Sequence, residues 1–188
     1  MSELVTARLR LRPWREDDLP AWIEMSCDPE VMAHFPALFS REQAESSLTR
    51  QNAFIAEHGY GFWAVEVVGG ARFIGFCGIK DVLFQAPFTP AVEVGWRLAR
   101  SHWGRGYATE AARASLAHGF HTLGLDEIVA FLLPANQRSA AVCERLGMRR
   151  DPSGDFDHPL IPNGTISVGG FAQQRHILYR LARREFQP

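Results

Sequence analysis

Period-two alternation of apolar and polar residues marks the strands that the sequence predicts. Residues 6–13 alternate small or apolar side chains with arginine, the pattern of a half-buried strand, and Pro13 ends it. Two apolar runs flank Gly69 and Gly70, a pair typical of a β-hairpin turn. A later run rich in Ile, Val, Phe and Leu has the composition of a buried strand. The predicted strands are residues 6–13, 60–68, 72–79, 91–98, 126–133 and 175–181.

Capping residues and helical spacing predict helices between these strands. Two aspartates and a proline within residues 17–20 start a helix that runs through Met25. A proline at the first helical position predicts a second, short helix from residues 28–29. The capping-box sequence at 40–43 starts a longer helix that ends near Gly59. Two further helices are predicted, one running to about residue 122 and one from Asn136 to about residue 146.

The order of these elements is β-α-α-α-β-β-β-α-β-α-β. Residues 80–90 and 151–170 contain several prolines or glycines, and we expect them to form loops. The chain has 188 residues, enough for one domain with a substantial core, and no repeat or low-complexity linker divides it. We therefore expect a single domain over residues 1–188.

Composition narrows the class of protein. The chain is 46% hydrophobic and 22% charged with a net charge of −1, so nothing favours nucleic acid or an anionic membrane as a partner. The first residues lack an apolar targeting segment, and no apolar run is long enough to span a bilayer. Cys27, Cys77 and Cys143 are widely spaced, which favours buried thiols in a reducing compartment over disulfides or metal ligands. We expect a soluble, cytoplasmic protein without a metal.

One stretch, Trp-Gly-Arg-Gly-Tyr-Ala-Thr-Glu-Ala at residues 103–111, carries the clearest chemical signal. It joins the strand at 91–98 to a helix, so free backbone N–H groups and the positive end of the helix dipole lie just after two glycines. Glycine lets the backbone approach a bulky anion, and Arg105 adds a charge-assisted donor. The stretch predicts a site for a phosphate-bearing cofactor, although a tight turn without a ligand gives the same pattern.

Two common nucleotide loops do not match this stretch. A Walker loop requires Lys and then Ser or Thr after its last glycine, where Tyr107 and Ala108 stand. A Rossmann loop requires a third glycine where Thr109 stands. The stretch instead resembles the pyrophosphate loop of the GNAT acyltransferase superfamily, Gln/Arg-x-x-Gly-x-Gly/Ala, at Gly106 and Ala108. Trp103 departs from the usual Gln or Arg, as is ordinary in the branch that contains the ribosomal-protein N-terminal acetyltransferases.

Later segments extend the resemblance over nearly the whole chain. Residues 136–148 resemble the Asn-x-x-Ser/Ala…Gly-Phe segment of the family, with Met148 in place of Phe. Residues 155–159 and 176–180 resemble the ribosomal-protein acetyltransferase branch, which we call Rim-type. The resemblance implies an α/β (α+β) GNAT fold. Such a fold has a central mixed, mostly antiparallel sheet, helices on both faces, and a splay between the fourth and fifth strands.

The resemblance implies transfer of an acetyl group from acetyl-CoA to a primary amine by direct attack. The chain must then hold the cofactor, remove a proton from the ammonium, and stabilise the oxyanion and the departing thiolate. The main chain of residues 96–98 would pair with the pantetheine amides like an added strand. Asn136 would meet the pantetheine arm at the splay, although it serves equally as a plain helix N-cap. The implied cofactor-binding residues are Trp96, Arg97, Leu98, Arg105, Gly106, Tyr107, Ala108, Thr109 and Asn136.

Glu93 is the candidate base. Alternation along its strand places it on one face with Ala91, Gly95 and Arg97, opposite the apolar side chains. A carboxylate on a central strand beside a thioester can take the proton of the amine, directly or through water. The alternative is a structural carboxylate paired with Arg97 or another cation.

The resemblance leaves the general acid open. Many family members place a tyrosine where Cys143 stands, and Cys143 has the character of a small buried side chain. Ser139, one turn earlier, is the candidate beside the departing sulfur, unless it is a solvent-facing helical serine. Positioning alone, with solvent protonating the thiolate, is a third interpretation.

The acceptor site is expected between the first helices and the loop at 151–170. His158 can titrate near neutral pH and contact the amine, or it can be a loop-packing residue. His34 is placed at the same mouth only by its position in the fold.

The resemblance therefore predicts an N-acetyltransferase whose partners are acetyl-CoA and an amine acceptor. The acceptor is a protein N-terminal amine, or a small amine or antibiotic. A non-catalytic CoA-binding sensor is the alternative from another class, because the usual tyrosine acid is missing, and a nucleotide-binding enzyme is a third. We expect no nucleic acid or membrane partner, and a monomer or homodimer.

Overall fold

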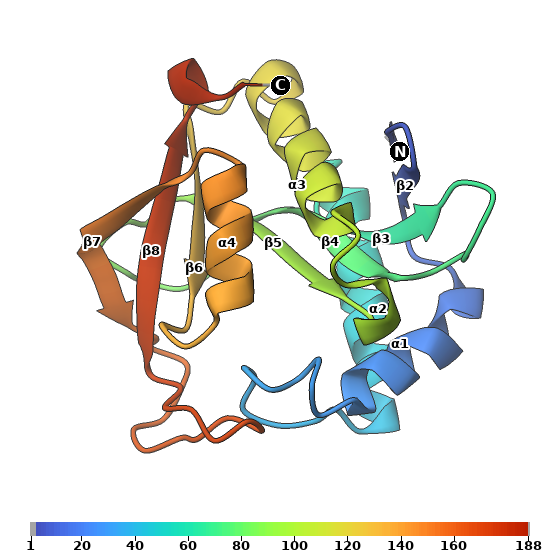
Figure 1. The fold of residues 1–188 in the computed structure, drawn as a ribbon, viewed down its shortest axis with the longest axis horizontal. Helices are drawn as coiled ribbons and strands as arrows, with labels where there is room; N and C mark the ends of the chain where they lie inside the picture. Colours follow the sequence, from blue (N-terminus) through green and yellow to red (C-terminus); the bar gives the residue numbers. More distant parts are fainter. Residues whose placement is uncertain (1–2, 188) are drawn as a thin grey trace.

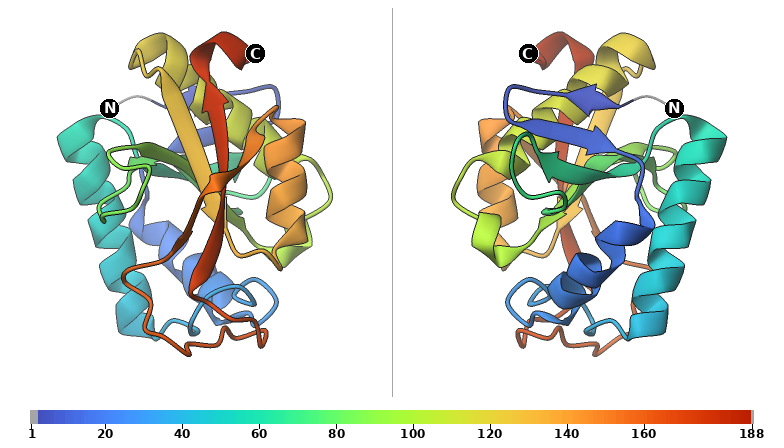
Figure 2. Two further views of the ribbon diagram at one scale, coloured as in Figure 1. Left: turned by 90° about the vertical axis from the view of Figure 1, so that its left-hand side faces the viewer. Right: turned by 90° about the vertical axis from the view of Figure 1, so that its right-hand side faces the viewer.

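A computed structural model describes residues 3–187 as one eight-stranded sheet with helices on both faces (Figures 1 and 2). The strand order is β1-β2-β3-β4-β5-β6-β8-β7, and every neighbouring pair is antiparallel except β5 with β6. This confirms the predicted mixed, mostly antiparallel sheet. The strands are β1 (Leu4–Val5), β2 (Leu9–Arg12), β3 (Phe62–Val67), β4 (Gly75–Asp81), β5 (Val92–Leu98), β6 (Glu127–Leu132), β7 (Arg149–Asp157) and β8 (Arg175–Ala182).

Helices cover both faces of the sheet, as Figure 2 shows. Trp22 of α1 packs edge-on against Phe76 of β4, with ring centroids 5.9 Å apart. Cys77, the next residue of β4, points to the other face and lies 3.9 Å from the hydroxyl of Ser115 in α3. This alternation separates an α1/α2 face from an α3/α4 face. The helices are α1 (Leu19–Cys27), α2 (Arg41–His58), α3 (Tyr107–Ala117) and α4 (Gln137–Arg145).

The caps predicted for the helix from 40 to 59 are present at both ends of α2. The Ser40 hydroxyl accepts a hydrogen bond from the Gln43 backbone N–H at 3.3 Å, and the Gln43 side chain accepts one from the Ser40 backbone N–H at 2.7 Å. Gly59 ends α2 with a φ of 79°, a left-handed conformation that glycine adopts without strain. Local sequence therefore fixes both ends of α2.

The parallel strands β5 and β6 separate soon after they meet. Their one registered pair is Glu93 with Val129, and no further pair follows toward the carboxyl ends of the two strands. The backbone of residues 95–98 therefore lacks a β6 partner within the described residues 3–187. This is the predicted splay between the strands at 91–98 and 126–133.

Two predictions of secondary structure were wrong. Residues 29–34 form turns rather than a short helix, because the Asp28 carboxylate accepts the backbone N–H of Glu30 at 2.8 Å. Residues 149–157, in part expected to be loop, form β7, whose pairing with β8 shifts between Asp151 and Phe156. That irregularity accommodates the proline and glycine on which the loop prediction rested.

The helix after the glycine turn ends near residue 122 as predicted, with α3 running to Ala117 and a π-helical turn over His118–Thr122. The cysteine prediction also needs a correction, because Cys77 and Cys143 are buried but Cys27 is exposed. Within residues 3–187, no helix combines the length and the apolar character needed to cross a bilayer.

Candidate active site

The glycine turn leads directly into the N-terminus of α3. Gly104 and Gly106 have φ angles of 73° and 79°, and Gly106 is the N-cap of the helix. The first hydrogen bond of the helix runs from the backbone N–H of Glu110 to the carbonyl of Gly106 at 3.0 Å. The backbone N–H groups at positions 107–109 precede that bond, so they are free to bind an anion.

An arginine from the N-terminal segment holds this turn in place. Arg8 donates to the Glu110 carboxylate at 2.6 Å and to the backbone carbonyl of Arg105 at 3.1 Å. Its guanidinium lies 4.8 Å from the ring centroid of Tyr107. Thr6 donates a further hydrogen bond to Glu110 at 2.6 Å. The first turn of α3 is therefore tied to the N-terminal segment by charge-assisted hydrogen bonds.

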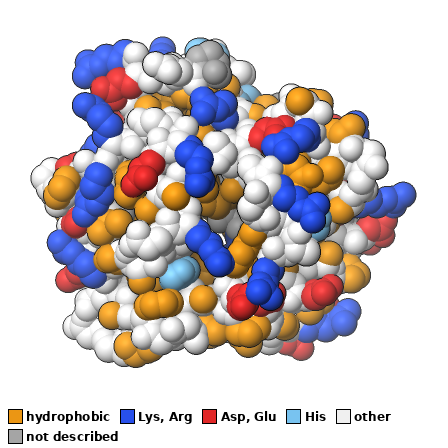
Figure 3. Space-filling model, viewed as in Figure 1, with side chains coloured by type: hydrophobic (Ala, Val, Ile, Leu, Met, Phe, Trp, Pro, Cys, Tyr) orange, Lys and Arg blue, Asp and Glu red, His pale blue; other side chains and the backbone are white. Residues whose placement is uncertain are grey.

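Trp103 stands where the family usually has Gln or Arg. Its indole N–H donates to the backbone carbonyl of Leu98 at 2.7 Å, which fixes the turn to the end of β5. The Arg138 guanidinium lies 4.5 Å from the centroid of the Trp103 ring. Within residues 3–187, neither Arg138 nor Arg105 has an ion-pair partner. Figure 3 shows Lys and Arg side chains around a hollow near the centre of the face that carries α3 and α4.

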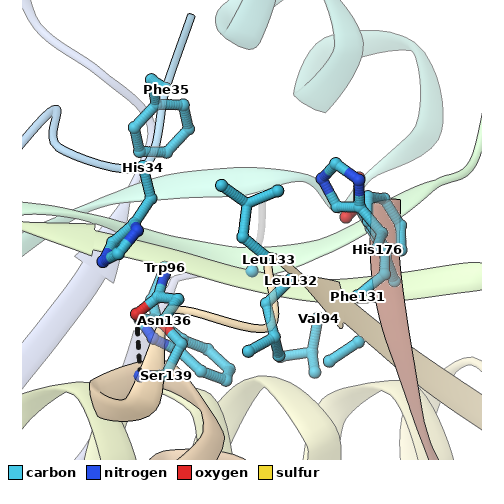
Figure 4. Close-up of a pocket in the computed structure, with 13 residues that line it drawn as sticks. His34, Phe35, Val94, Trp96, Phe131, Leu132, Leu133, Asn136, Ser139 and His176 are labelled. Carbon is cyan, nitrogen blue, oxygen red and sulfur yellow. Dashed lines mark hydrogen bonds between the residues drawn. The ribbon is translucent and has the colours of Figure 1, made fainter. Parts of the chain in front are cut away.

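A cavity of about 140 Å³ opens where β5 and β6 separate. Its walls come from residues 93–96 of β5, residues 130–133 at the end of β6, and the start of α4. His34 and Phe35 line one side, and Phe131 and His176 lie on another (Figure 4). The structure thus brings Glu93, Trp96, Asn136, Ser139 and His34 from the predicted site residues to one cavity.

Among the described residues, Glu93 is the only carboxylate that lines this cavity. Desolvation raises the pKa of Glu93 to about 7, and the positive charge of Lys80, which faces it across the β4–β5 pairing, acts in the opposite direction. The alternative pair with Arg97 is not formed within the described residues. The Arg97 guanidinium lies instead 3.7 Å from the Phe35 ring centroid, and its pKa falls to about 9 because of burial.

The start of α4 supplies two polar side chains to the cavity. The Asn136 carbonyl oxygen accepts the backbone N–H of Ser139 at 3.2 Å, the bond drawn in Figure 4. Asn136 is therefore an N-cap and a cavity residue at once, and its NH₂ group has no partner among residues 3–187. Cys143, one turn after Ser139, is fully buried, and burial raises its pKa to about 12.

The three histidines near the acceptor side have different surroundings. His34 stacks on Phe171 with centroids 4.9 Å apart, and its Nδ1 is buried without a partner in the described chain. His158 is not among the residues that line the cavity, and its ring lies 5.2 Å from that of His176. The segments that carry His34 and Phe171 are joined by backbone hydrogen bonds of 2.9 and 3.0 Å.

Sequence reasoning did not single out three of these residues. Lys80 was placed in a loop, Arg138 inside a helical segment, and His176 on one face of the last strand. Their roles depend on pairings between distant segments: β4 with β5, α4 with the glycine turn, and β8 with β6. Only the alternation that pointed His176 to one face of its strand gave a local signal.

Comparison with known proteins agrees with this geometry. The family model for the acetyltransferase (GNAT) domain matches residues 8–149. The uncharacterized protein YkkB of Bacillus subtilis is 34% identical over 148 residues, which cover 78% of this chain and 85% of YkkB. A GNAT-family acetyltransferase from Bacillus anthracis has a TM-score of 0.79 and 25% identity, covering 98% of this chain and 100% of that chain.

Rim-type enzymes also share the architecture. The ribosomal L7/L12 alpha-N-protein acetyltransferase RimL, in complex with coenzyme A, has a TM-score of 0.72 and covers 96% of this chain and 98% of its own. Its identity is 18%, so this likeness shows the fold alone. The family model, by contrast, spans the glycine turn, Glu93 and the start of α4. The chain belongs to the GNAT acetyltransferase family.

Proposed function

We propose that this chain, as one domain over residues 1–188, binds acetyl-CoA and transfers its acetyl group to a primary amine. The observation that carries the proposal is the cavity at the β5–β6 splay, which joins a carboxylate of raised pKa to the polar start of α4. Acetyl-CoA would supply an acetyl group already activated as a thioester. The residues of the chain would bind, orient and move protons.

The fit to the cofactor rests on three features. The N–H groups of Tyr107, Ala108 and Thr109, with the left-handed turn at Gly106, form a cradle for a pyrophosphate. Arg105 and Arg138, which have no ion-pair partner in the part of the chain that the structure describes, add charge around it.

The β6 side of residues 96–98 is unpaired in the described structure and is available to pantetheine amides as an added strand. The Leu98 carbonyl already accepts the Trp103 indole N–H, so a pantetheine amide there would use its second lone pair. The NH₂ group of Asn136 would donate to the same arm.

Glu93 would act as the general base. With a pKa of about 7 it is roughly half ionised at neutral pH, close to the optimum for proton transfer near that pH. It would accept a proton from the ammonium of the acceptor, directly or through water.

Ser139 would lie beside the departing sulfur. Its hydroxyl has no hydrogen-bond partner within residues 3–187, and it lines the cavity. Cys143 is a poor proton donor because burial raises the pKa of its thiol. The departing thiolate would therefore be stabilised or protonated by Ser139, by the N-terminal dipole of α4, or by solvent.

The acceptor would enter between the turns around His34 and the loop that carries Phe171, with His158 behind the wall of the cavity. A protein N-terminal amine, as for the Rim-type enzymes, or a small amine or antibiotic are the acceptor classes proposed.

The test is acetyl transfer from acetyl-CoA, read by product mass, on Ala-, Ser- and Met-starting peptides, polyamines and aminoglycosides. Wild type would be compared with Glu93→Gln and with Glu57→Gln, which changes an exposed carboxylate away from the cavity. We expect a product from wild type and from Glu57→Gln, with a loss of at least tenfold for Glu93→Gln.

The main rival is a non-catalytic CoA-binding sensor. Stabilisation of the protein by CoA without turnover of any amine would favour the sensor, because CoA binding raises the melting temperature whether or not transfer follows. No stabilisation by CoA would contradict the cofactor assignment itself.

A further inference from the structure

His176 is the second residue of β8, and its ring forms part of the cavity wall. The residue is 8% exposed. In Figure 4 its ring stands beside Phe131, across the cavity from His34 and Phe35. It therefore shares the small space in which Glu93 would meet the acceptor.

The hydrogen bonding of His176 determines which nitrogen carries the proton. Its Nδ1 lies 3.2 Å from the backbone carbonyl oxygen of Gln174. A carbonyl only accepts, so Nδ1 must be the N–H that donates. Burial lowers the pKa of His176 to about 4, so the ring is neutral at ordinary pH and carries no second proton. Nε2 then carries a lone pair and no proton.

That lone pair is available to a ligand. No residue among 3–187 donates a hydrogen bond to Nε2 of His176. Nδ1 of His34 and Nε2 of His118 are buried without a hydrogen-bond partner in the described chain. Nε2 of His176 is not buried in this way. The ring lines the cavity, and its acceptor atom is not sealed inside the protein.

Aromatic neighbours hold the ring in this orientation. The rings of Phe131, Phe156 and His158 lie 6.1, 5.6 and 5.2 Å from it, centroid to centroid. A ring fixed by packing on these neighbours and by the Gln174 carbonyl cannot turn its N–H toward the cavity without losing that bond. The cavity thus presents a fixed acceptor in addition to the Glu93 carboxylate.

Resting on the proposed function, we propose that Nε2 of His176 accepts a hydrogen bond from an N–H of the acceptor amine and orients its lone pair for attack. Glu93 removes one proton from the ammonium, which leaves a primary amine with two N–H groups and one lone pair. One N–H donates to His176, and the lone pair is directed at the thioester carbon. His176 itself neither gains nor loses a proton.

The kinetic test compares two substitutions at this position. His176→Phe keeps an aromatic ring but has no acceptor, whereas His176→Gln can place a carbonyl oxygen near the position of Nε2. We expect His176→Phe to lower kcat/KM for the acceptor roughly tenfold, the effect of losing one hydrogen bond. We expect His176→Gln to recover most of that loss. The affinity for CoA should stay unchanged in both, and the exposed His121→Phe variant should match wild type.

A second measurement does not depend on turnover. In protein with ¹⁵N-labelled histidine, NMR should show His176 as the neutral Nδ1–H tautomer from pH 8 down to pH 5. Addition of an acetylated acceptor from the panel should shift its Nε2 resonance.

Three outcomes would overturn the inference. The first is an NMR spectrum that shows the proton on Nε2. The second is a kcat/KM in His176→Phe equal to that of wild type. The third is a loss of kcat/KM in His176→Gln as large as the loss in His176→Phe. If substitution of His158 lowers kcat/KM and substitution of His176 does not, the role belongs to His158. If wild type binds CoA but acetylates no amine, the proposed function fails, and the inference fails with it.

Discussion

Lys80 offers a direct test of how the cavity sets the pKa of Glu93. The two residues face each other in the β4–β5 pairing, and the lysine charge opposes the rise in pKa that burial causes at Glu93. Lys80→Met removes the charge and keeps most of the side-chain length. We therefore expect the pKa of Glu93 to rise above its wild-type value of about 7.

The structure limits the size of that rise. The Lys80 ammonium lies 4.6 Å from the centroid of the Phe54 ring, which directs it toward α2 rather than straight at the carboxylate. Two unit charges roughly 7 Å apart interact by about 0.6 to 2.4 kcal/mol for effective dielectric constants of about 80 to 20. One pKa unit corresponds to about 1.4 kcal/mol, so the expected shift is about one unit. At pH 7 the ionised fraction of Glu93 would then fall from about one half to about one tenth.

The assay is the pH dependence of kcat/KM from pH 5.5 to 9.5, measured on one acceptor for wild type, Lys80→Met and Lys80→Arg. The ionisation of the acceptor is the same in all three profiles, so a difference between them reports the enzyme. We expect the rising limb to move up by about one unit in Lys80→Met and to stay in place in Lys80→Arg. A limb that does not move, or that moves to lower pH, would refute the assignment of this ionisation to Glu93.

Two further predictions concern stability and cofactor affinity. The folded-state pKa of Glu93 exceeds its ordinary value of 4.5, so the contribution of protonated Glu93 to stability is fully present below pH 4.5 and is lost as the pH rises through about 7. At pH 8, Glu93→Gln should therefore have a free energy of unfolding about 2 kcal/mol above that of wild type, after allowance for the partial exposure of the side chain, and should melt a few degrees higher. At pH 4.5 the two proteins should be equally stable. A constant difference at both pH values in thermal melts would contradict this. Arg8→Met should raise the Kd for CoA about fivefold, because it frees the turn before α3, while Arg10→Met, whose partner Glu3 lies 3.9 Å away, should not. Equal calorimetric affinities for the two arginine variants would refute the role of Arg8.

The parts of the site that sequence predicts are those that one segment builds alone. The turn before α3 follows from two glycines and a helix start, and the face of Glu93 follows from strand alternation. The cap role of Asn136 follows from its place before a helical pattern. Each of these signals lies within a few residues, so neighbouring elements do not change it.

The parts that sequence misses depend on distant segments. Proline and glycine made residues 151–157 look like a loop, yet pairing with β8 pulls them into a strand with a shifted register. The charge that opposes the rise in the pKa of Glu93 comes from Lys80 on the adjacent strand. The cation over the ring of Trp103 comes from Arg138 on α4. No local pattern reports such contacts, because sheet order determines them.

The missing tyrosine is weak evidence for a sensor. A departing thiolate belongs to a thiol with a pKa of about 8.5, so near neutral pH it needs little help from an acid. Cys143 cannot provide that help, since burial raises its pKa to about 12 and proton transfer to the thiolate would be uphill. A binding protein needs only the turn before α3 and the unpaired edge of β5. Glu93 adds nothing to either, and its raised pKa lowers the stability of the fold above pH 7. A carboxylate that lowers stability, placed in a cavity beside the splay, is accounted for by the proposed removal of a proton from an amine and not by cofactor binding alone.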